Sequence, residues 1–291
     1  MKKLLLALAL FTYLGSFSQD TLTTYYTESW NVVSKKYAKF YRKSFKIAKK
    51  QYGVKDYFID GQLQMTGVYS DKKYKKRSGD FSYYFENGEK EMEGKYLKNK
   101  AVGKWTWWYD NGNLSQEGEY TQKGKRTGHW KDYYEEGGLN NEGDFINDEG
   151  TGTWKFYFES GELSAKEKYE GGELIDFKFY NEDGSRVDER RSLTTPPKYS
   201  EDDDFYKDFM KENLKYPRTE KSKGHEGLAI IKVSIGKDGK VTEHEIFLSS
   251  GYGKLDDEAL RVCKLIKEMI PGKMHNRLEE FTYYIPVRFS I

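Results

Sequence analysis

The sequence GKWTWWYDNGNLSQEGEY (residues 103 to 120) decides the fold, because it recurs along the chain with limited change. Related stretches begin at Gly79, Gly128 and Gly152, and each has an aromatic residue two positions after its glycine. From Gly79 to Gly152 the steps are 24, 25 and 24 residues, which indicates a repeat array. A truncated copy (57 to 69) precedes these four copies, and a decayed copy (177 to 187) follows them.

Each copy has the pattern of a β-hairpin. In the quoted copy, Trp105, Trp107 and Tyr109 alternate along one face of a strand. The following Asn111-Gly112 predicts a two-residue type I′ turn, because these residue types tolerate the positive φ angles that such a turn needs. A lone hairpin is marginal in water, so we expect the copies to stack into an elongated sheet.

The predicted turn also sets which residues face each other across a hairpin. Antiparallel pairing places Trp105 opposite Gly118 and Tyr109 opposite Leu114. In two other copies, Phe81 opposes Gly94 and Trp130 opposes Gly143. An aromatic ring that covers a cross-strand glycine strengthens a glycine-containing strand. The fourth copy places Glu167 opposite Trp154, so we expect it to pack less regularly.

The aromatic stripe of the array is the first candidate binding surface. Its residues are Phe81, Trp105, Trp107, Tyr109, Trp130 and Trp154. Aromatics with period 2 in stacked hairpins have to cover the sheet first, so a role in the core between repeats is favoured over a ligand platform. A face that binds glycans stays open as an alternative.

The N-terminus has the pattern of a secretory signal peptide, predicted to span residues 1 to 18. Lys2 and Lys3 precede an apolar run, and small residues at Ser16 and Ser18 suit cleavage before Gln19. A retained membrane anchor is the alternative, but the run is shorter than the roughly 20 apolar residues that a spanning helix needs. We therefore expect a protein that is exported to the periplasm, that can associate with the cell envelope, and that has no membrane span after cleavage.

Composition and motifs argue against several classes of function. Lys and Arg (49) nearly balance Asp and Glu (47), so the net charge of +2 predicts no nucleic-acid partner. The sequence has no HExxH, GxSxG, P-loop, CxxC or EF-hand pattern, and its four histidines are scattered. The single Cys263 falls on the apolar face of a predicted helix. We expect a non-catalytic protein without a cofactor or a metal site.

The chain is predicted to be mainly β, with a small α+β domain at its C-terminus. The hairpin array covers residues 19 to 187, a polar linker 188 to 203, and the C-terminal domain 204 to 291. Residues 20 to 51 are the least informative, and strands are favoured there over a basic amphipathic helix.

The C-terminal domain has the predicted order helix, strand, strand, helix, strand. The first helix ends before Pro217, and two strands lie on either side of the turn GKDGK. The second helix places Leu255 to Ile270 at helical spacing and stops at Pro271-Gly272. FTYYIPVRFSI closes the chain as a strand, so an antiparallel sheet is expected to pack on a helix.

Two family resemblances follow from these motifs. YP at 216 to 217, SSG at 249 to 251, LD..AL..V from Leu255, PG at 271 to 272 and IPVRF at 285 to 289 resemble the C-terminal domain of TonB-family energy transducers, over about residues 203 to 291. The hairpin copies resemble MORN-type repeats, also found in YwqK-like antitoxins, over about residues 52 to 187. MORN-type repeats imply a scaffold for protein or membrane contact.

The TonB resemblance implies a partner and a contact strand. In that family, a strand near the C-terminus pairs with a short segment of an outer-membrane transporter. Carried over, the contact residues are Thr282, Tyr283, Tyr284, Ile285, Val287, Arg288 and Phe289. Pro286 cannot donate a ladder hydrogen bond, which predicts an edge strand or a bulge.

Departures from the family favour an adaptor over an energy transducer acting alone. The family's N-terminal anchor and Pro-rich spacer are not seen, and Met269-Ile270 stands where the family has a Trp before Pro-Gly. We expect a partner among outer-membrane transporters or other envelope proteins, with a link to energy-dependent transmembrane transport. In the alternative, the array holds an envelope protein or a glycan, and the C-terminal domain is structural.

Overall fold

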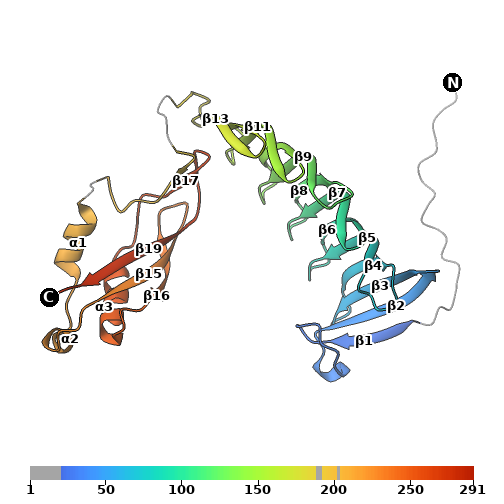
Figure 1. Ribbon diagram of the computed structural model, residues 1–291, viewed down its shortest axis with the longest axis horizontal. Helices are drawn as coiled ribbons and strands as arrows, with labels where there is room; N and C mark the ends of the chain where they lie inside the picture. Colours follow the sequence, from blue (N-terminus) through green and yellow to red (C-terminus); the bar gives the residue numbers. More distant parts are fainter. Residues whose placement is uncertain (1–20, 188–191, 202–203) are drawn as a thin grey trace. The chain divides into compact units, whose positions relative to one another are not determined.

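The structure is a computed structural model that describes residues 21–187, 192–201 and 204–291. The predicted signal peptide (1 to 18) lies outside these described residues. The chain is mainly β with an α+β C-terminal domain, as predicted, and Figure 1 shows the succession of strands followed by a smaller sheet with helices. The described residues form two compact units, one of residues 21–153 with 169–173, and one of residues 154–168 with 174–187, 192–201 and 204–291.

The repeats form a 13-stranded sheet in which the strands follow the order of the sequence (Figure 1). The strands are β1 (Leu22–Tyr26), β2 (Phe40–Ala48), β3 (Gln51–Phe58), β4 (Leu63–Tyr69), β5 (Arg77–Tyr84), β6 (Lys90–Leu97), β7 (Lys100–Trp108), β8 (Leu114–Tyr120), β9 (Arg126–Tyr133), β10 (Leu139–Ile146), β11 (Glu149–Tyr157), β12 (Leu163–Glu170) and β13 (Glu173–Phe179). Pairs from β1 to β10 are antiparallel.

The register across each hairpin matches the prediction at the aromatic positions. Trp105 pairs with Gly118, Phe81 with Gly94, and Trp130 with Gly143. The rings that cover Gly94 and Gly118, however, come from the following copy: a Cβ on Gly94 would lie 2.1 Å from Trp105, and one on Gly118 would lie 2.1 Å from Trp130. The ring of one repeat therefore packs on the glycine of the preceding repeat. This contact buries the indoles of Trp105 and Trp130 within the sheet.

The turn within the quoted hairpin differs from the predicted type I′ turn. Only Gly112 of the pair Asn111-Gly112 has a positive φ (85°), and a bulge pairs Leu114 with Trp108 instead of Tyr109. This is the geometry of a three-residue loop with glycine in the left-handed region. Asn111 acts through its side chain, whose Nδ2 donates to the Glu135 carbonyl of the next repeat at 2.9 Å.

Two-residue turns with two positive φ angles occur between the hairpins instead. Lys98 and Asn99 (50° and 72°) join β6 to β7, and Asn147 and Asp148 (56° and 79°) join β10 to β11. The type I′ turn was therefore predicted for the loop within a hairpin, whereas it occurs in the loops between hairpins. These short polar loops lack the Asn-Gly pair, which is the stronger sequence signal for such a turn.

The N-terminal stretch of the array is built of strands, as favoured from the sequence. The strands β1 and β2 are separated by a short 3₁₀ helix (Lys35–Tyr37). Across β2 and β3, Arg42 faces Asp56, and its Nε and Nη2 each lie 2.7 Å from a carboxylate oxygen of Asp56. Asp56 is fully buried, so this ion pair lies in the interior of the first strands, beside the buried Val54 of the same strand.

The C-terminal domain has the predicted order of elements, with three additional short strands and one additional short helix. Its elements are β14 (Thr194–Thr195), α1 (Phe205–Asn213), α2 (Arg218–Ser222), β15 (Gly227–Ile235), β16 (Val241–Leu248), α3 (Gly253–Cys263), β17 (Lys273–Met274), β18 (Arg277–Leu278) and β19 (Phe281–Phe289). The main sheet has the order β16-β15-β19, and its core includes residues of α3.

The second predicted helix is shorter than expected. α3 ends at Cys263, so Ile266 and Ile270 lie beyond it, although Ile266 still reaches the core. After the helix the chain makes backbone hydrogen bonds to other segments, from Val241 N–H to the Lys267 carbonyl and between Lys198 and Ile270. Helical spacing alone could not reveal these bridges.

Residues 194 to 199, which fall in the predicted linker, are bound to the C-terminal domain. β14 pairs with β17, and Tyr199 stacks on Tyr206 of α1 with ring centroids 4.8 Å apart. Among the residues that the structure describes, no helix combines the length and apolar character that crossing a membrane requires.

Candidate functional site

The predicted contact strand β19 lies at an edge of the C-terminal sheet. It pairs along its whole length with β15, from Phe281 opposite Ile235 to Phe289 opposite Gly227. Ile285 and Val287 are fully buried, and Phe289 is nearly so. Together with the half-buried Tyr283, these predicted contact residues therefore hold the strand on its core instead of facing a partner.

The other predicted residues of β19 face solvent. Thr282, Tyr284 and Arg288 are exposed, and Pro286 between them is exposed as well. Because side chains alternate along a strand, only this half of the predicted set can contact a partner through side chains.

Pro286 defines which backbone groups of β19 remain accessible. It stands opposite Ile230 and cannot donate to β15, so its carbonyl belongs to the set that points away from β15. By the alternation of an antiparallel ladder, the N–H and C=O groups of Thr282, Tyr284 and Arg288 point to the same open edge. An added strand could pair with these groups.

A tyrosine of α1 covers part of this edge. The hydroxyl of Tyr206 donates a hydrogen bond to the Pro286 carbonyl. Burial, followed by the neighbouring Cys263 and Tyr283, raises the pKa of Tyr206 well above its usual range, so the hydroxyl keeps its proton. Tyr206 could not be predicted from the sequence, because nothing in FYKDFMKEN distinguishes a tyrosine that faces a strand edge from one in a core.

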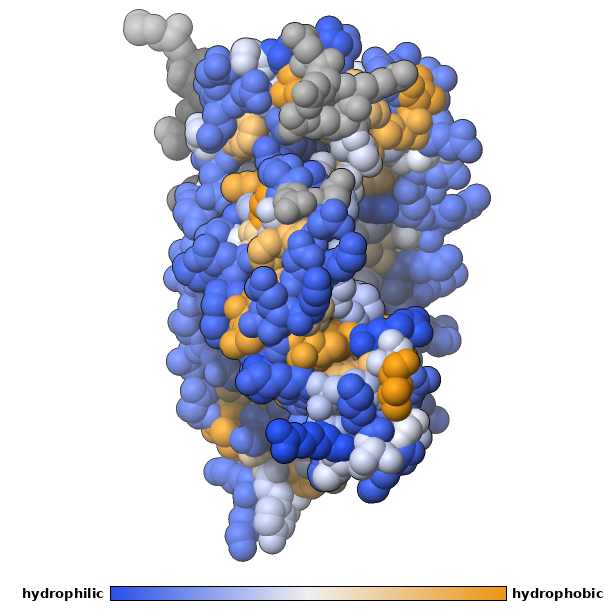
Figure 2. All heavy atoms as spheres, turned by 90° about the vertical axis from the view of Figure 1, so that its left-hand side faces the viewer, coloured by the Kyte–Doolittle hydropathy of each residue, from blue (hydrophilic) through white to orange (hydrophobic). Residues whose placement is uncertain are grey.

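The open face of the sheet carries an exposed aromatic pair. Phe247 of β16 is 61% exposed, and its ring centroid lies 4.8 Å from that of Tyr284, which is 46% exposed. Leu248 beside it is also exposed. In sequence, the run Ile246-Phe247-Leu248 breaks the alternation of a half-buried strand, and this signal could have found the pair. Figure 2 shows apolar residues in small groups between polar ones on the face in view.

The SSG motif at 249 to 251 positions the start of α3. Ser249 Oγ donates to Asp256 Oδ2 at 2.5 Å, and both the N–H and the hydroxyl of Ser250 donate to Oδ1 at 2.7 Å. Burial opposes ionisation of Asp256, but these hydrogen bonds outweigh it and lower its pKa. Burial raises the pKa of Cys263 to about 12, so this thiol is a core residue.

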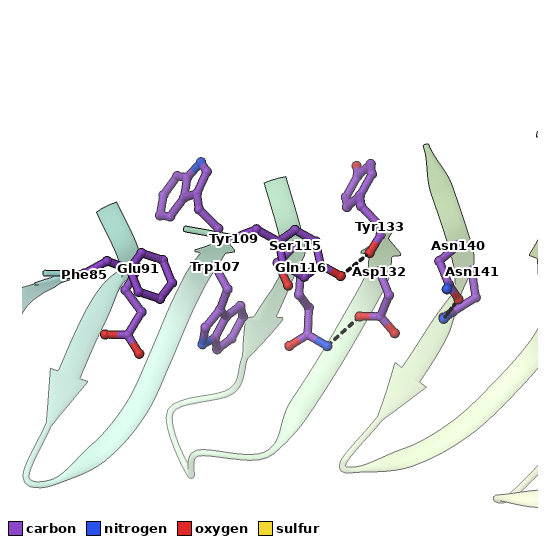
Figure 3. Close-up of a pocket in the computed structure, with 11 residues that line it drawn as sticks. Phe85, Glu91, Trp107, Tyr109, Ser115, Gln116, Asp132, Tyr133, Asn140 and Asn141 are labelled. Atoms are coloured by element: carbon purple, nitrogen blue, oxygen red, sulfur yellow. Dashed lines mark hydrogen bonds between the residues drawn. The ribbon is translucent and has the colours of Figure 1, made fainter. Parts of the chain in front are cut away.

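The aromatic residues of the array divide into two groups. Phe81, Trp105 and Trp130 are buried, whereas Trp107, Tyr109 and Trp154 are half-buried. Buried rings meet their neighbours edge to face, as Trp105 does with Tyr96 at 4.9 Å between centroids. The core role favoured from the sequence fits the first group. The half-buried Trp107 and Tyr109 instead line a groove whose position was not predicted from the sequence (Figure 3).

The last full repeat is bound to the C-terminal domain through the turn between β17 and β18. The His275 ring stacks on Phe156 with centroids 3.7 Å apart, and its Nδ1 lies 2.5 Å from Oε1 of the fully buried Glu167. Asn276 Nδ2 donates to the Tyr180 carbonyl at 2.7 Å. Glu167, which departs from the glycine pattern, is thus matched by a histidine from the C-terminal part of the same compact unit.

Within residues 21–187, 192–201 and 204–291, no group of three or more His, Cys, Asp or Glu side chains has the geometry to hold a metal ion. The expectation of no metal site and no cofactor stays a prediction.

Two parts of the chain match models of known families. Residues 212–291 match the family model described as the C-terminal domain of the Gram-negative bacterial TonB protein. Residues 101–122, 126–147 and 151–170 match the model of the MORN repeat variant. A solved structure to which the chain is similar is the C-terminal domain of Helicobacter pylori TonB, at 22% identity over 30% of this chain and 77% of that one, with a TM-score of 0.24. No curated protein matches the chain.

Proposed function

Because the chain joins MORN-variant repeats to a TonB-type C-terminal domain, we propose that it is a non-catalytic adaptor of the cell envelope. Its C-terminal domain contacts outer-membrane TonB-dependent transporters, or related envelope proteins, by accepting a short segment as an added strand beside β19. The array offers a second contact surface and links this contact to the envelope. Export to the periplasm belongs to the same proposal.

The open edge of β19 is the observation that carries the proposal. Thr282, Tyr284 and Arg288 present backbone donors and acceptors there, and strand addition obtains its affinity from such main-chain hydrogen bonds. Pro286 offers no donor, and its carbonyl is already bound by Tyr206. An added segment therefore pairs on both sides of Pro286 and is expected to be short.

The side chains next to this edge provide selectivity. Tyr284 and Phe247 form an exposed aromatic surface, and Arg288 adds a positive charge at the C-terminal end of the strand. A matching segment has apolar residues at alternate positions near Tyr284 and an acidic residue near Arg288.

The test measures binding of immobilised receptor-segment peptides to the purified protein. Arg288→Pro removes a backbone donor from the open edge, whereas Arg288→Ala removes the same side chain and keeps the donor. We expect the proline variant to lose retention and the alanine variant to keep most of it. Circular dichroism and thermal melting check that both variants are folded.

Two results would reject the proposal. One is no retention of the unmodified protein by any peptide in a panel of transporter segments. The other is equal retention of Arg288→Pro and Arg288→Ala by peptides that bind the unmodified protein, because added-strand pairing depends on the donor that only the proline removes.

A further inference from the structure

One row of residues on the array changes character in the middle of the sheet. Four positions after the repeat glycines lie Tyr83, Trp107 and Asp132, so the third copy has a carboxylate where its neighbours have aromatic rings. The cross-strand partners change in the same direction. Met92 pairs with Tyr83, Gln116 with Trp107, and Asn141 with Asp132.

These residues form one continuous row across six strands, β5 to β10. Met92 of β6 pairs with Trp107 of β7, and Gln116 of β8 pairs with Asp132 of β9. Neighbouring side chains in such a row are separated by the spacing between strands, about 4.7–4.9 Å. The half-buried indole of Trp107 is therefore followed by three polar side chains at regular intervals, Gln116, Asp132 and Asn141.

The row lies along a groove of about 480 Å³, within the roughly 300–1,000 Å³ that is usual for small-molecule sites. Figure 3 shows Glu91, Trp107, Gln116 and Asp132 projecting to the same side of the strands, with the rings of Phe85 and Tyr109 nearby. The side chains are held in place: Gln116 Nε2 donates to Asp132 Oδ1 at 2.5 Å, and the Tyr109 hydroxyl donates to the Tyr133 carbonyl at 2.7 Å.

The charges of the groove select against anionic ligands. Among its described lining residues, Glu91 and Asp132 are acidic and none is basic. Phosphate, sulfate or carboxylate groups would meet like charges there. Carboxylate and amide oxygens instead accept hydrogen bonds from hydroxyl groups, and the face of an indole packs against apolar C–H surfaces.

We propose that this groove binds a neutral oligosaccharide. One pyranose ring packs its C–H face on Trp107, and the hydroxyl groups of the next rings bond to Gln116, Asp132 and Asn141. The regular spacing of the row suits a chain of sugar rings, because one unit of such a chain is close in length to the separation of neighbouring strands. The site lies on the array and is independent of the strand edge at β19.

The experiment titrates the full protein with cellotetraose, maltotetraose and N-acetylglucosamine tetramer, each to about 10 mM. Binding is followed by tryptophan fluorescence and by isothermal calorimetry. We expect saturable binding of at least one oligosaccharide. Asp132→Asn, which keeps the shape of the side chain, and Asn141→Ala should each weaken it, and Asp132→Asn by at least about tenfold because a charged acceptor is lost.

The matched control is Glu119→Gln, which neutralises an exposed acid of β8 outside the groove and should leave binding unchanged. Trp107→Leu tests the ring platform with apolar packing retained, and it should abolish the fluorescence change while thermal melting confirms folding. The proposal is overturned if no oligosaccharide binds, if the Asp132 and Trp107 variants bind as the parent does, or if tetralysine peptide binds and the sugars do not.

Discussion

The hydroxyl of Tyr206 donates a hydrogen bond to the main-chain carbonyl of Pro286, although the two residues are 80 positions apart in the chain. This bond places α1 beside the strand that the TonB resemblance assigns to partner contact. It also gives a hydrogen-bond donor to the carbonyl of Pro286, the edge residue that has no N–H of its own. The intact protein therefore presents an edge whose centre is closed and whose two ends are open.

Removing this hydroxyl should make the strand edge a better acceptor. In Tyr206→Phe the Pro286 carbonyl has lost the hydroxyl that binds it. An incoming peptide then no longer has to break this intramolecular hydrogen bond, which contributes about 0.5–1.5 kcal/mol. We expect receptor-segment peptides to bind up to about tenfold more tightly, measured by calorimetry. Weaker binding of a folded Tyr206→Phe protein would show that the tyrosine supports the contact instead of limiting it.

Substituting the glycine under an indole should destabilise the array. A Cβ at Gly94 would lie 2.1 Å from Trp105, so Gly94→Ala forces the ring out of position. Overpacking of this kind costs about 1–3 kcal/mol of unfolding free energy, which denaturant titration would detect. The same substitution in a Trp105→Leu background should cost less, and equal costs in both backgrounds would contradict the contact between repeats.

The hydrogen bonds to Asp256 predict a pH-dependent contribution to stability. The pKa of this carboxyl is lowered in the folded state, so its contribution is present above the unfolded pKa of about 3.9 and is lost as pH falls through the folded pKa. At pH 7, Asp256→Asn should lose about 1–3 kcal/mol of unfolding free energy. The difference from the parent should shrink below about pH 4, and a constant difference across this window would contradict the assignment.

The contact between His275 and Glu167 should couple the last repeat to the C-terminal domain. His275→Ala removes a stacked ring and one partner of a fully buried carboxylate, so we expect a lower melting temperature and faster proteolysis near residues 154–168. With Glu167→Gln in addition, the loss should be smaller than the sum of the single losses. Additive losses would indicate that the two side chains do not interact.

Local patterns in the sequence predicted the elements whose signals are short-range. The hairpin period, the aromatic–glycine register and the strand order of the C-terminal domain follow from spacing and alternation, and the structure confirms them. The type I′ turn at Asn111-Gly112 was wrong because the hairpin closes through a three-residue loop in which only Gly112 of this pair has a positive φ. The second helix was too long because its last residues form backbone bonds to segments around 198 and 241.

The candidate site was predicted only in part. The strand 281 to 289 was placed correctly, but alternation along an edge strand leaves half of the named side chains in the core. Tyr206, Phe247 and His275 were missed because each acts on a residue far away in sequence, Pro286, Tyr284 and Glu167. No single-sequence pattern encodes such pairs, although the apolar run at 246 to 248 marked an exposed patch.

The central claim, that β19 accepts an added strand, is tested most directly by amide hydrogen exchange with and without a saturating receptor-segment peptide. The N–H groups of Thr282, Tyr284 and Arg288 should become protected together, while those of Tyr283, Ile285 and Val287, which point toward β15, keep their original exchange rates. Peptide binding that leaves these three amides exchanging at their original rates would contradict the account.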